Sequence, residues 1–266
     1  MEVETMNAKW TRVTPRQKCP ICHKPDWCCI GDRYVNCMRM QSEKACGNGG
    51  WLHPLESNPI PVVFRPPVHE EPRINFTAHW QEWSNYTDFE SVQTLAEQLG
   101  VSPLALRCLG AVWSGEYWAF PMRDEWENIT GIQFRHSNGF KQTMRGSHVG
   151  YFIPDCPPQS TAFVTEGASD CASALTLGLF AVGKYNCAQS GARLGQYLRR
   201  KRVRDVVVVS DNDGPGILGA EKLAGEIHMH CCIYTPPAKD LRMAVSLGIT
   251  KAVIDSTVSS LQWRQP

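Results

Sequence analysis

The segment VVVVSDNDGPG, residues 206–216, constrains the fold of this chain more than any other. Its four consecutive valines predict a strand that is buried on both faces, as strands of parallel sheets are. Two carboxylates, Asp211 and Asp213, follow directly at the carboxyl end of this strand. Acidic groups placed there cost stability unless a positive charge lies nearby, and a divalent metal ion is the obvious candidate.

The second half of the chain alternates between strand-like and helix-like patterns. The predicted strands are residues 161–165, 179–183, 205–210 and 231–235, and the predicted helices are residues 168–178, 191–201 and 215–229. Such alternation predicts an α/β fold with a parallel sheet wound by helices. In these folds the functional groups gather beyond the carboxyl ends of the strands.

The rest of the chain divides by composition. Six of the twelve cysteines lie within residues 1–56, and residues 57–73 are proline-rich and typical of an extended linker. Residues 74–153 begin with two helical patterns, the second with Ser102 as N-cap and Pro103 at its first position. Short alternating segments follow and predict a small antiparallel meander, so this region is a small α+β unit before the α/β domain of residues 154–266.

Composition restricts the class of protein. The formal net charge is +1, and 42% of the residues are hydrophobic, which is enough for a packed core. No apolar run approaches the roughly 20 residues of a membrane span, and the first residues do not resemble a signal peptide. We therefore expect a cytoplasmic protein without a membrane partner, in which clustered cysteines bind metal or stay reduced.

The cysteine cluster has the spacing of a zinc site. Cys19 and Cys22 form a C-x2-C knuckle, and Cys28 and Cys37 can supply the second pair of a tetrahedral site. The second pair is open to alternatives, which are His23, Cys29 and Cys46. A closed site of four thiolates is structural, and a segment this short needs such a metal to fold.

Aromatic and basic residues surround this cluster. They are Lys24, Trp27, Arg33, Tyr34, Arg39 and Trp51. A mixed surface of this kind suits single-stranded nucleic acid. The alternative is that the tryptophans only pack the small domain.

A second acidic group belongs with the first. Glu166 ends the predicted strand of TAFVTEG, and in an extended segment Asp211 and Asp213 project to the same side. Converging carboxylates repel one another, and Mg²⁺ relieves this because it prefers oxygen ligands. Asp170 lies one helical turn after Glu166 and can join this site or support it. The glycines of DGPG would let the backbone approach a phosphate.

Glu166-Gly167 and Asp211-x-Asp213 in this order resemble the signature of the TOPRIM domain, the metal-binding fold of bacterial-type primases, topoisomerases and some nucleases. A zinc-binding segment, a basic mixed region and then TOPRIM is the layout of the bacterial replicative primase. The chain is most similar to compact primase-like proteins of phages and mobile elements, through CPICHKPDWC, GGWLH, FPMRD, TGIQFR, GSHVGYFIP, TEGASD and SDNDGPG. The middle region is much shorter than the basic subdomain of the replicative enzyme.

The resemblance implies a DNA primase that synthesises short RNA primers on single-stranded DNA from ribonucleoside triphosphates. Glu166, Asp211 and Asp213 would then hold catalytic Mg²⁺ or Mn²⁺, with Asp170 beside them, and the zinc ion would be structural. A replicative helicase or a DNA polymerase is the further partner that it suggests. The cations expected to contact template or triphosphate are Arg123, Arg135, Lys141 and Arg145. The alternative for each of them is an ordinary solvated sheet face.

Weaker signals follow the other strands. Lys184 and Lys239 are candidates for phosphate contact, and Asp240 is a secondary acidic candidate. The basic stretch RRKRVR, residues 199–204, either complements a helix dipole or touches nucleic acid.

Three other functions compete with primer synthesis. A TOPRIM nuclease would use the same acidic residues, although the zinc segment favours template binding. A topoisomerase needs a tyrosine domain that the sequence does not indicate. A single-strand DNA-binding replication factor without catalysis would leave the acidic residues without a use.

Overall fold

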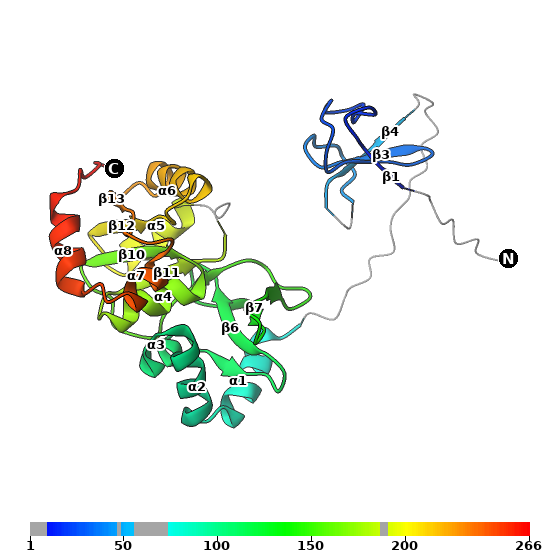
Figure 1. Cartoon of the computed structure of the whole chain (residues 1–266). Coiled ribbons are helices and arrows are strands. Elements are labelled where there is room, and N and C mark those ends of the chain that lie inside the picture. Colours follow the sequence, from blue (N-terminus) through cyan, green and yellow to red (C-terminus); the bar gives the residue numbers. More distant parts are fainter. Residues whose placement is uncertain (1–9, 47–48, 56–73, 187–190) are drawn as a thin grey trace. The chain divides into compact units, whose positions relative to one another are not determined.

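The computed structural model describes residues 10–46, 49–55, 74–186 and 191–266. The chain forms two compact units, Met1–Glu70 and Glu71–Pro266 (Figure 1). The proposed linker of residues 57–73 lies outside the described residues. No helix of the described residues is long and apolar enough to cross a membrane.

The first unit is a small antiparallel sheet of four strands in the order β1-β2-β3-β4. The strands are β1 (Thr11–Arg12), β2 (Cys29–Ile30), β3 (Tyr34–Cys37) and β4 (Trp51–Pro54). Its buried core consists of Val13 and Val35 together with Cys19, Cys28 and Cys37. Ile21, Ile30 and Met38 pack partly buried against it, but this apolar surface is small for a domain of this size, so a metal ion held by the cysteines would supply much of its stability.

The second unit contains one mixed sheet of nine strands. Its parallel part comprises β10 (Thr161–Glu166), β11 (Ala181–Lys184), β12 (Asp205–Val209) and β13 (His230–Tyr234). The helices between them are α4 (Gly167–Thr176), α5 (Gly191–Arg200) and α6 (Gly214–Glu226). The predicted order of strands and helices is therefore confirmed, with the boundaries moved by at most three residues.

The valine strand is buried on both faces, as its sequence predicts. Val207 and Val209 belong to a core shared with α2 (Phe89–Leu99), α3 (Pro103–Cys108), α4, α7 (Leu241–Ser246) and α8 (Lys251–Ser260). Val206 and Val208 point to the opposite face and pack against residues of α5 and α6. Helices on both faces leave the carboxyl ends of the strands as the accessible edge of the sheet.

The antiparallel meander is confirmed as β6 (Trp118–Arg123), β7 (Ile129–Arg135) and β8 (Lys141–Thr143). It is preceded by α1 (Phe76–Tyr86), α2, α3 and β5 (Val112–Trp113), and α1 packs on β5 and β7. Ser102 caps α3 by accepting a hydrogen bond from the Ala105 N–H, and Pro103 stands at its first turn, as predicted.

The expected parallel sheet is in fact the larger mixed sheet. The short strand β9 (Tyr151–Phe152) pairs antiparallel with both β11 and β6, and so joins the meander to the parallel strands. Gly150 precedes this junction, where a Cβ atom would lie 2.5 Å from the Arg123 carbonyl oxygen. The division of the second unit into residues 74–153 and 154–266 stays a prediction.

Candidate metal and nucleotide site

The acidic residues of the second unit lie where parallel strands end and helices begin. Glu166 is the last residue of β10 and the N-cap of α4, and Asp211 follows β12 by two residues. The parallel register pairs Val164 with Val208, so the two strands end at the same level. The topology therefore brings Glu166 and Asp211 to one edge, as expected from the sequence.

Asp213 and Asp240 are both N-caps. The Asp213 carboxylate accepts a hydrogen bond of 2.7 Å from the Gly216 N–H at the start of α6. The Asp240 carboxylate accepts one of 2.7 Å from the Met243 N–H at the start of α7. Each carboxylate keeps a second oxygen for another partner, so capping does not exclude metal binding.

The tertiary structure explains why residue 216 is a glycine, which the sequence does not reveal. A Cβ atom at this position would lie 2.7 Å from both the Cβ and the carbonyl oxygen of Asp211. Glycine thus lets the first turn of α6 approach the chain at Asp211. Gly214 has open space around it and meets no such restriction.

The carboxylates at this edge influence one another electrostatically. Burial, together with the negative charges of Glu166, Asp240 and Asp213, raises the pKa of Asp211 to about 6. Lys239 acts against this shift. A cluster of this kind destabilises the ionised state, which a bound cation would restore.

Asp170 is more deeply buried than Asp211. Burial, together with the charges of Asp240 and Asp211, raises the pKa of Asp170 to about 7, although a hydrogen bond of 2.9 Å from the Arg242 N–H opposes the shift. Its contact with the first turn of α7 makes Asp170 a link between α4 and α7.

The donor chemistry of this edge fits Mg²⁺ or Mn²⁺. All the candidate ligands are carboxylate oxygens, and Mg²⁺ is held by one or two carboxylates while it keeps several waters. Among the described residues, only the cysteines bring three potential ligand atoms within 4.8 Å of one another. Water and substrate oxygens would therefore complete the coordination of a cation held by these carboxylates.

Lys141 reaches this edge from β8. Its Nζ atom lies 3.5 Å from the position that a Cβ of Gly167 would occupy. Burial of the ammonium lowers the pKa of Lys141, as does Arg135, whereas Asp170 and Asp211 oppose the change. The side chain as a whole keeps much of its surface in solvent.

Arg242 was missed by the sequence analysis. Its charge lowers the pKa of Arg135, after the larger effect of burial, and it also lowers that of Lys141. The sequence feature that could have identified Arg242 is its position two residues after Asp240, in the segment KDLR. Arg135, Lys141 and Arg242 thus form a set of cations beside the carboxylates, drawn from both halves of the second unit.

The other predicted cations have different surroundings. Lys184 is buried at the end of β11, where it is the register partner of Glu166, and the Lys239 carbonyl oxygen accepts a hydrogen bond of 2.8 Å from Asn212. Arg145 is exposed in the turn after β8.

The contacts of Arg123 that the structure describes do not involve the acidic residues of this edge. Its guanidinium donates a hydrogen bond of 3.0 Å to the Glu127 carbonyl oxygen and lies over the Trp80 ring, 5.8 Å from its centroid. It lines a cavity of about 480 Å³ with Trp80 and Asp155.

The first three residues of the basic stretch 199–204 make contacts within the protein. Arg199 donates hydrogen bonds to the carbonyl oxygens of Ile227 and His228, beyond α6. Arg200 donates to the Glu125 carbonyl oxygen, and Lys201 forms an ion pair of 2.7 Å with Glu127. These contacts fix the turn between β6 and β7 to the end of α5.

The first unit holds a four-cysteine cluster. The sulfur atoms of Cys19, Cys22, Cys28 and Cys37 lie within 4.8 Å of one another. Three of these side chains are fully buried, and Cys22 is half-buried. Four thiolates at this separation fit a zinc-ribbon domain. The alternatives His23, Cys29 and Cys46 are not members of the cluster.

The thiols differ in acidity. Burial raises the pKa of Cys28 to about 12. Burial also acts on Cys22, but hydrogen bonds from the Lys24 backbone and from the neighbouring thiols lower its pKa to about 7. A thiol site of mixed acidity releases protons when it binds metal.

The aromatic residues near the cluster are not core residues. Trp27 is 70% exposed and Tyr34 is 38% exposed, whereas Trp51 is half-buried. Arg39 lies 5.3 Å from the centroid of the Trp27 ring, and Lys44 lies 5.1 Å from that of Tyr34. This surface combines accessible rings with cations, as single-strand binding surfaces do.

Solved structures of primases share this fold. The chain is similar to the DnaG primase catalytic domain bound to ssDNA, with a TM-score of 0.55 and 12% identity over 70% of this chain and 80% of that chain. It is similar to the zinc-binding and RNA polymerase domains of the Aquifex aeolicus primase, with a TM-score of 0.57 and 11% identity over 70% of this chain and 60% of that chain.

A third neighbour belongs to a bacteriophage T7 assembly. In it the lagging-strand DNA polymerase interacts with primase domains of two gp4 subunits bound to an RNA/DNA hybrid and dTTP. The TM-score is 0.52 and the identity 18%, over 62% of this chain and 90% of that chain. No protein-family model and no curated protein matches the sequence. The chain therefore has the α/β fold of primase catalytic cores, as its TOPRIM-like motifs indicate.

Proposed function

We propose that this protein is a DNA primase, which synthesises short RNA primers on single-stranded DNA. The observation that carries the proposal is the convergence of Glu166, Asp211 and Asp213 at the carboxyl edge of a sheet with the primase fold. A group of carboxylates that raises the pKa of its own member Asp211 is prepared for a divalent cation.

Glu166, Asp211 and Asp213 would hold Mg²⁺ or Mn²⁺, with Asp170 supporting them from α4. The metal would supply neutralisation of the triphosphate charge and activation of the attacking hydroxyl. Asp170 orients the first turn of α7 through the Arg242 N–H. Asp213 fixes the start of α6 beside Asp211.

The cations beside this edge would bind phosphate. Lys141, whose Nζ atom lies beside Gly167 at this edge, would contact the triphosphate, and Arg135 would add to the same positive region. Arg145, Lys184 and Lys239 are further candidates, and Arg123 is the weakest one because its described contacts lie elsewhere. Bringing several cations together is costly unless a polyanion neutralises them.

The four cysteines would bind one structural zinc ion, and the exposed rings and cations beside them would bind template DNA. The neighbouring structures include a primase domain bound to ssDNA and an assembly with a DNA polymerase. We accordingly propose single-stranded DNA and ribonucleoside triphosphates as substrates, a DNA polymerase or replicative helicase as partner, and replication of phage or mobile-element DNA in the cytoplasm as the setting.

The test is primer synthesis on a single-stranded DNA circle of mixed sequence with labelled ribonucleotides and Mg²⁺ or Mn²⁺. We expect short labelled products from the wild type. Asp211→Asn should reduce them by at least about a hundredfold, because it removes a metal ligand without changing side-chain volume. Asp255→Asn, on the exposed face of α8, is the matched control and should retain activity.

Two results would contradict the proposal. Degradation of the circle by the wild type, lost in Asp211→Asn, would identify a TOPRIM-type nuclease. DNA binding without synthesis, with a DNA polymerase or helicase also supplied, would indicate a non-catalytic replication factor.

A further inference from the structure

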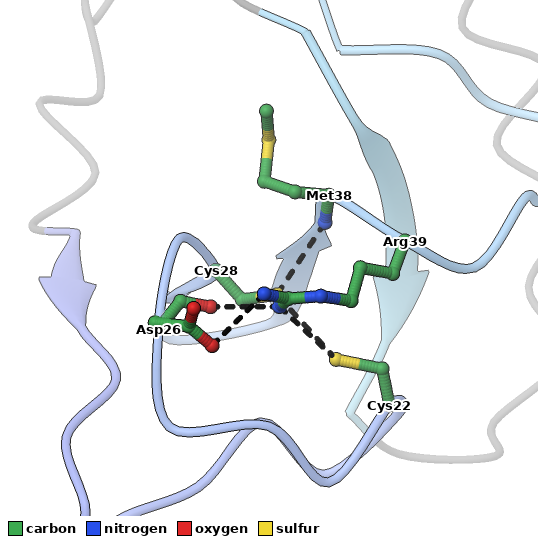
Figure 2. Close-up of polar contacts among 5 residues, drawn as sticks. All are labelled: Cys22, Asp26, Cys28, Met38 and Arg39. Atoms are coloured by element: carbon green, nitrogen blue, oxygen red, sulfur yellow. Dashed lines mark hydrogen bonds and ion pairs between the residues drawn. The ribbon is translucent and has the colours of Figure 1, made fainter. Parts of the chain in front are cut away.

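The guanidinium of Arg39 lies against the thiols of the four-cysteine cluster. Its Nη1 atom is 3.9 Å from the Sγ atom of Cys22 and 3.9 Å from that of Cys28. Figure 2 shows the Arg39 side chain reaching toward Asp26, with its guanidinium beside Cys28 and dashed lines to Cys22 and Asp26. One arginine thus contacts a thiol from each half of the cluster, the C-x2-C knuckle and the second pair.

Two neighbours hold Arg39 in this position. Nη1 also donates a hydrogen bond of 2.9 Å to the Asp26 carbonyl oxygen, and Nη2 forms an ion pair of 2.9 Å with the Asp26 carboxylate (Figure 2). The central carbon of the guanidinium lies over the Trp27 ring, 5.3 Å from the ring centroid. A planar group fixed by a carboxylate and an aromatic face loses little further freedom when it contacts the thiolates.

A zinc ion bound by the four cysteines would leave excess negative charge in the cluster. Four thiolates around one divalent cation leave a net charge of −2, in a core where three of the cysteines are fully buried. Backbone N–H groups supply partial compensation, since Met38 donates to Cys28 at 3.4 Å and Met40 donates to Cys37 at 3.3 Å. Among the described contacts of the four sulfur atoms, Arg39 is the charged side-chain donor.

We propose that Arg39 is a positioning residue of the metal centre. It offsets the negative charge of the metal–thiolate group and holds Cys22 and Cys28 at the separation that a tetrahedral site requires. Asp26 acts through Arg39 by fixing its guanidinium. This inference rests on zinc binding by the four cysteines, as proposed above.

The experiment measures metal binding by the full-length protein rather than activity. Zinc affinity is determined by competition with a chromophoric chelator, and Co²⁺ is substituted to record the sulfur-to-cobalt charge-transfer band. We expect Arg39→Gln to bind zinc roughly tenfold more weakly and to shift this band, because partners that orient metal ligands have effects of this size. Arg39→Lys should be intermediate, since an ammonium keeps the charge but loses the planar fork.

Two further variants make the outcome decisive. Arg12→Gln removes the same charge from an exposed side chain on β1 and should behave as the wild type. Asp26→Asn leaves Arg39 in the chain but weakens its support, so an intermediate affinity is expected even if Arg39→Gln fails to fold. If the wild type holds zinc and Arg39→Gln matches Arg12→Gln in affinity and spectrum, the role of Arg39 is refuted. A wild type without zinc would instead refute the zinc site itself.

Discussion

At the residue scale, burial and mutual repulsion decide the behaviour of the acidic edge. The pKa of Asp170 is raised to about 7 from an ordinary 3.8. Between these two values the folded protein binds more protons than the unfolded chain, so its stability falls as the pH rises through this range. The ionised carboxylate is therefore a destabilising group at neutral and higher pH in the metal-free protein.

Asp170→Asn should remove this penalty and keep an acceptor oxygen for the Arg242 N–H. In the metal-free protein at pH 8 we expect the free energy of unfolding to rise by about 2 kcal/mol, roughly half of the full linkage value because local hydration screens the charge. The gain should shrink as the pH falls toward 3.8. Urea unfolding of both proteins at several pH values measures it, and equal stabilities at pH 8 would contradict the assignment.

At the scale of elements, α5 packs closely against the end of α6. Gly195 lies on α5, and a Cβ atom there would be 2.2 Å from the carbonyl oxygen of Ile227, the residue that ends α6. This backbone contact is rigid, so a larger residue must push the two helices apart. The sequence alone gave no sign that this glycine differs from the others.

Gly195→Ala should lower the free energy of unfolding by about 1–3 kcal/mol, because overpacking of a rigid contact shifts the backbone. Gly225→Ala on α6 is the matched control, since nothing lies within 4 Å of its Cβ position. There alanine should raise stability by about 0.5–1 kcal/mol through its higher helix propensity. Thermal unfolding that ranks the two variants in the opposite order would show that the contact is not a constraint.

At the scale of the whole molecule, the two units depend on different forces. The second unit buries two large apolar cores, one on each face of its sheet. Among the described residues of the first unit, Val13 and Val35 are the fully buried apolar residues apart from the cysteines, with Ile21, Ile30 and Met38 partly buried around them. The free energy of metal binding would therefore supply most of the folding free energy of the first unit.

Removal of the metal should unfold the first unit alone. In calorimetry we expect a chelator to abolish one of two transitions and to leave the other at its original midpoint. Cys19→Ser should reproduce this result without chelator and should reduce the bound zinc by metal analysis. A chelator that moves both transitions equally would mean that the two units unfold as one.

Local patterns in the sequence determined most of the elements and much of the site. The valine run predicted a doubly covered strand, Ser102 and Pro103 predicted the start of α3, and C-x2-C spacing predicted half of the cysteine cluster. Glu166 and Asp211 were predictable as neighbours because parallel strands end at a common edge. Each of these inferences uses residues that are close in sequence or a general rule of sheet topology.

Only the tertiary structure decided which distant side chains meet. Lys141 comes to the acidic edge and Arg123 contacts Trp80, although the sequence presents both as cations on short strands. The backbone N–H of Arg242 contacts Asp170, which lies 72 residues away along the chain. The Arg39 guanidinium contacts thiols that lie up to 17 residues away. The contact of Lys141 with the acidic edge depends on β9, which joins the meander to the parallel strands of the same sheet, and the contact of Arg39 depends on how the loops of the first unit close. A local pattern does not encode them, because the free energy that selects them comes from the packing of the whole unit.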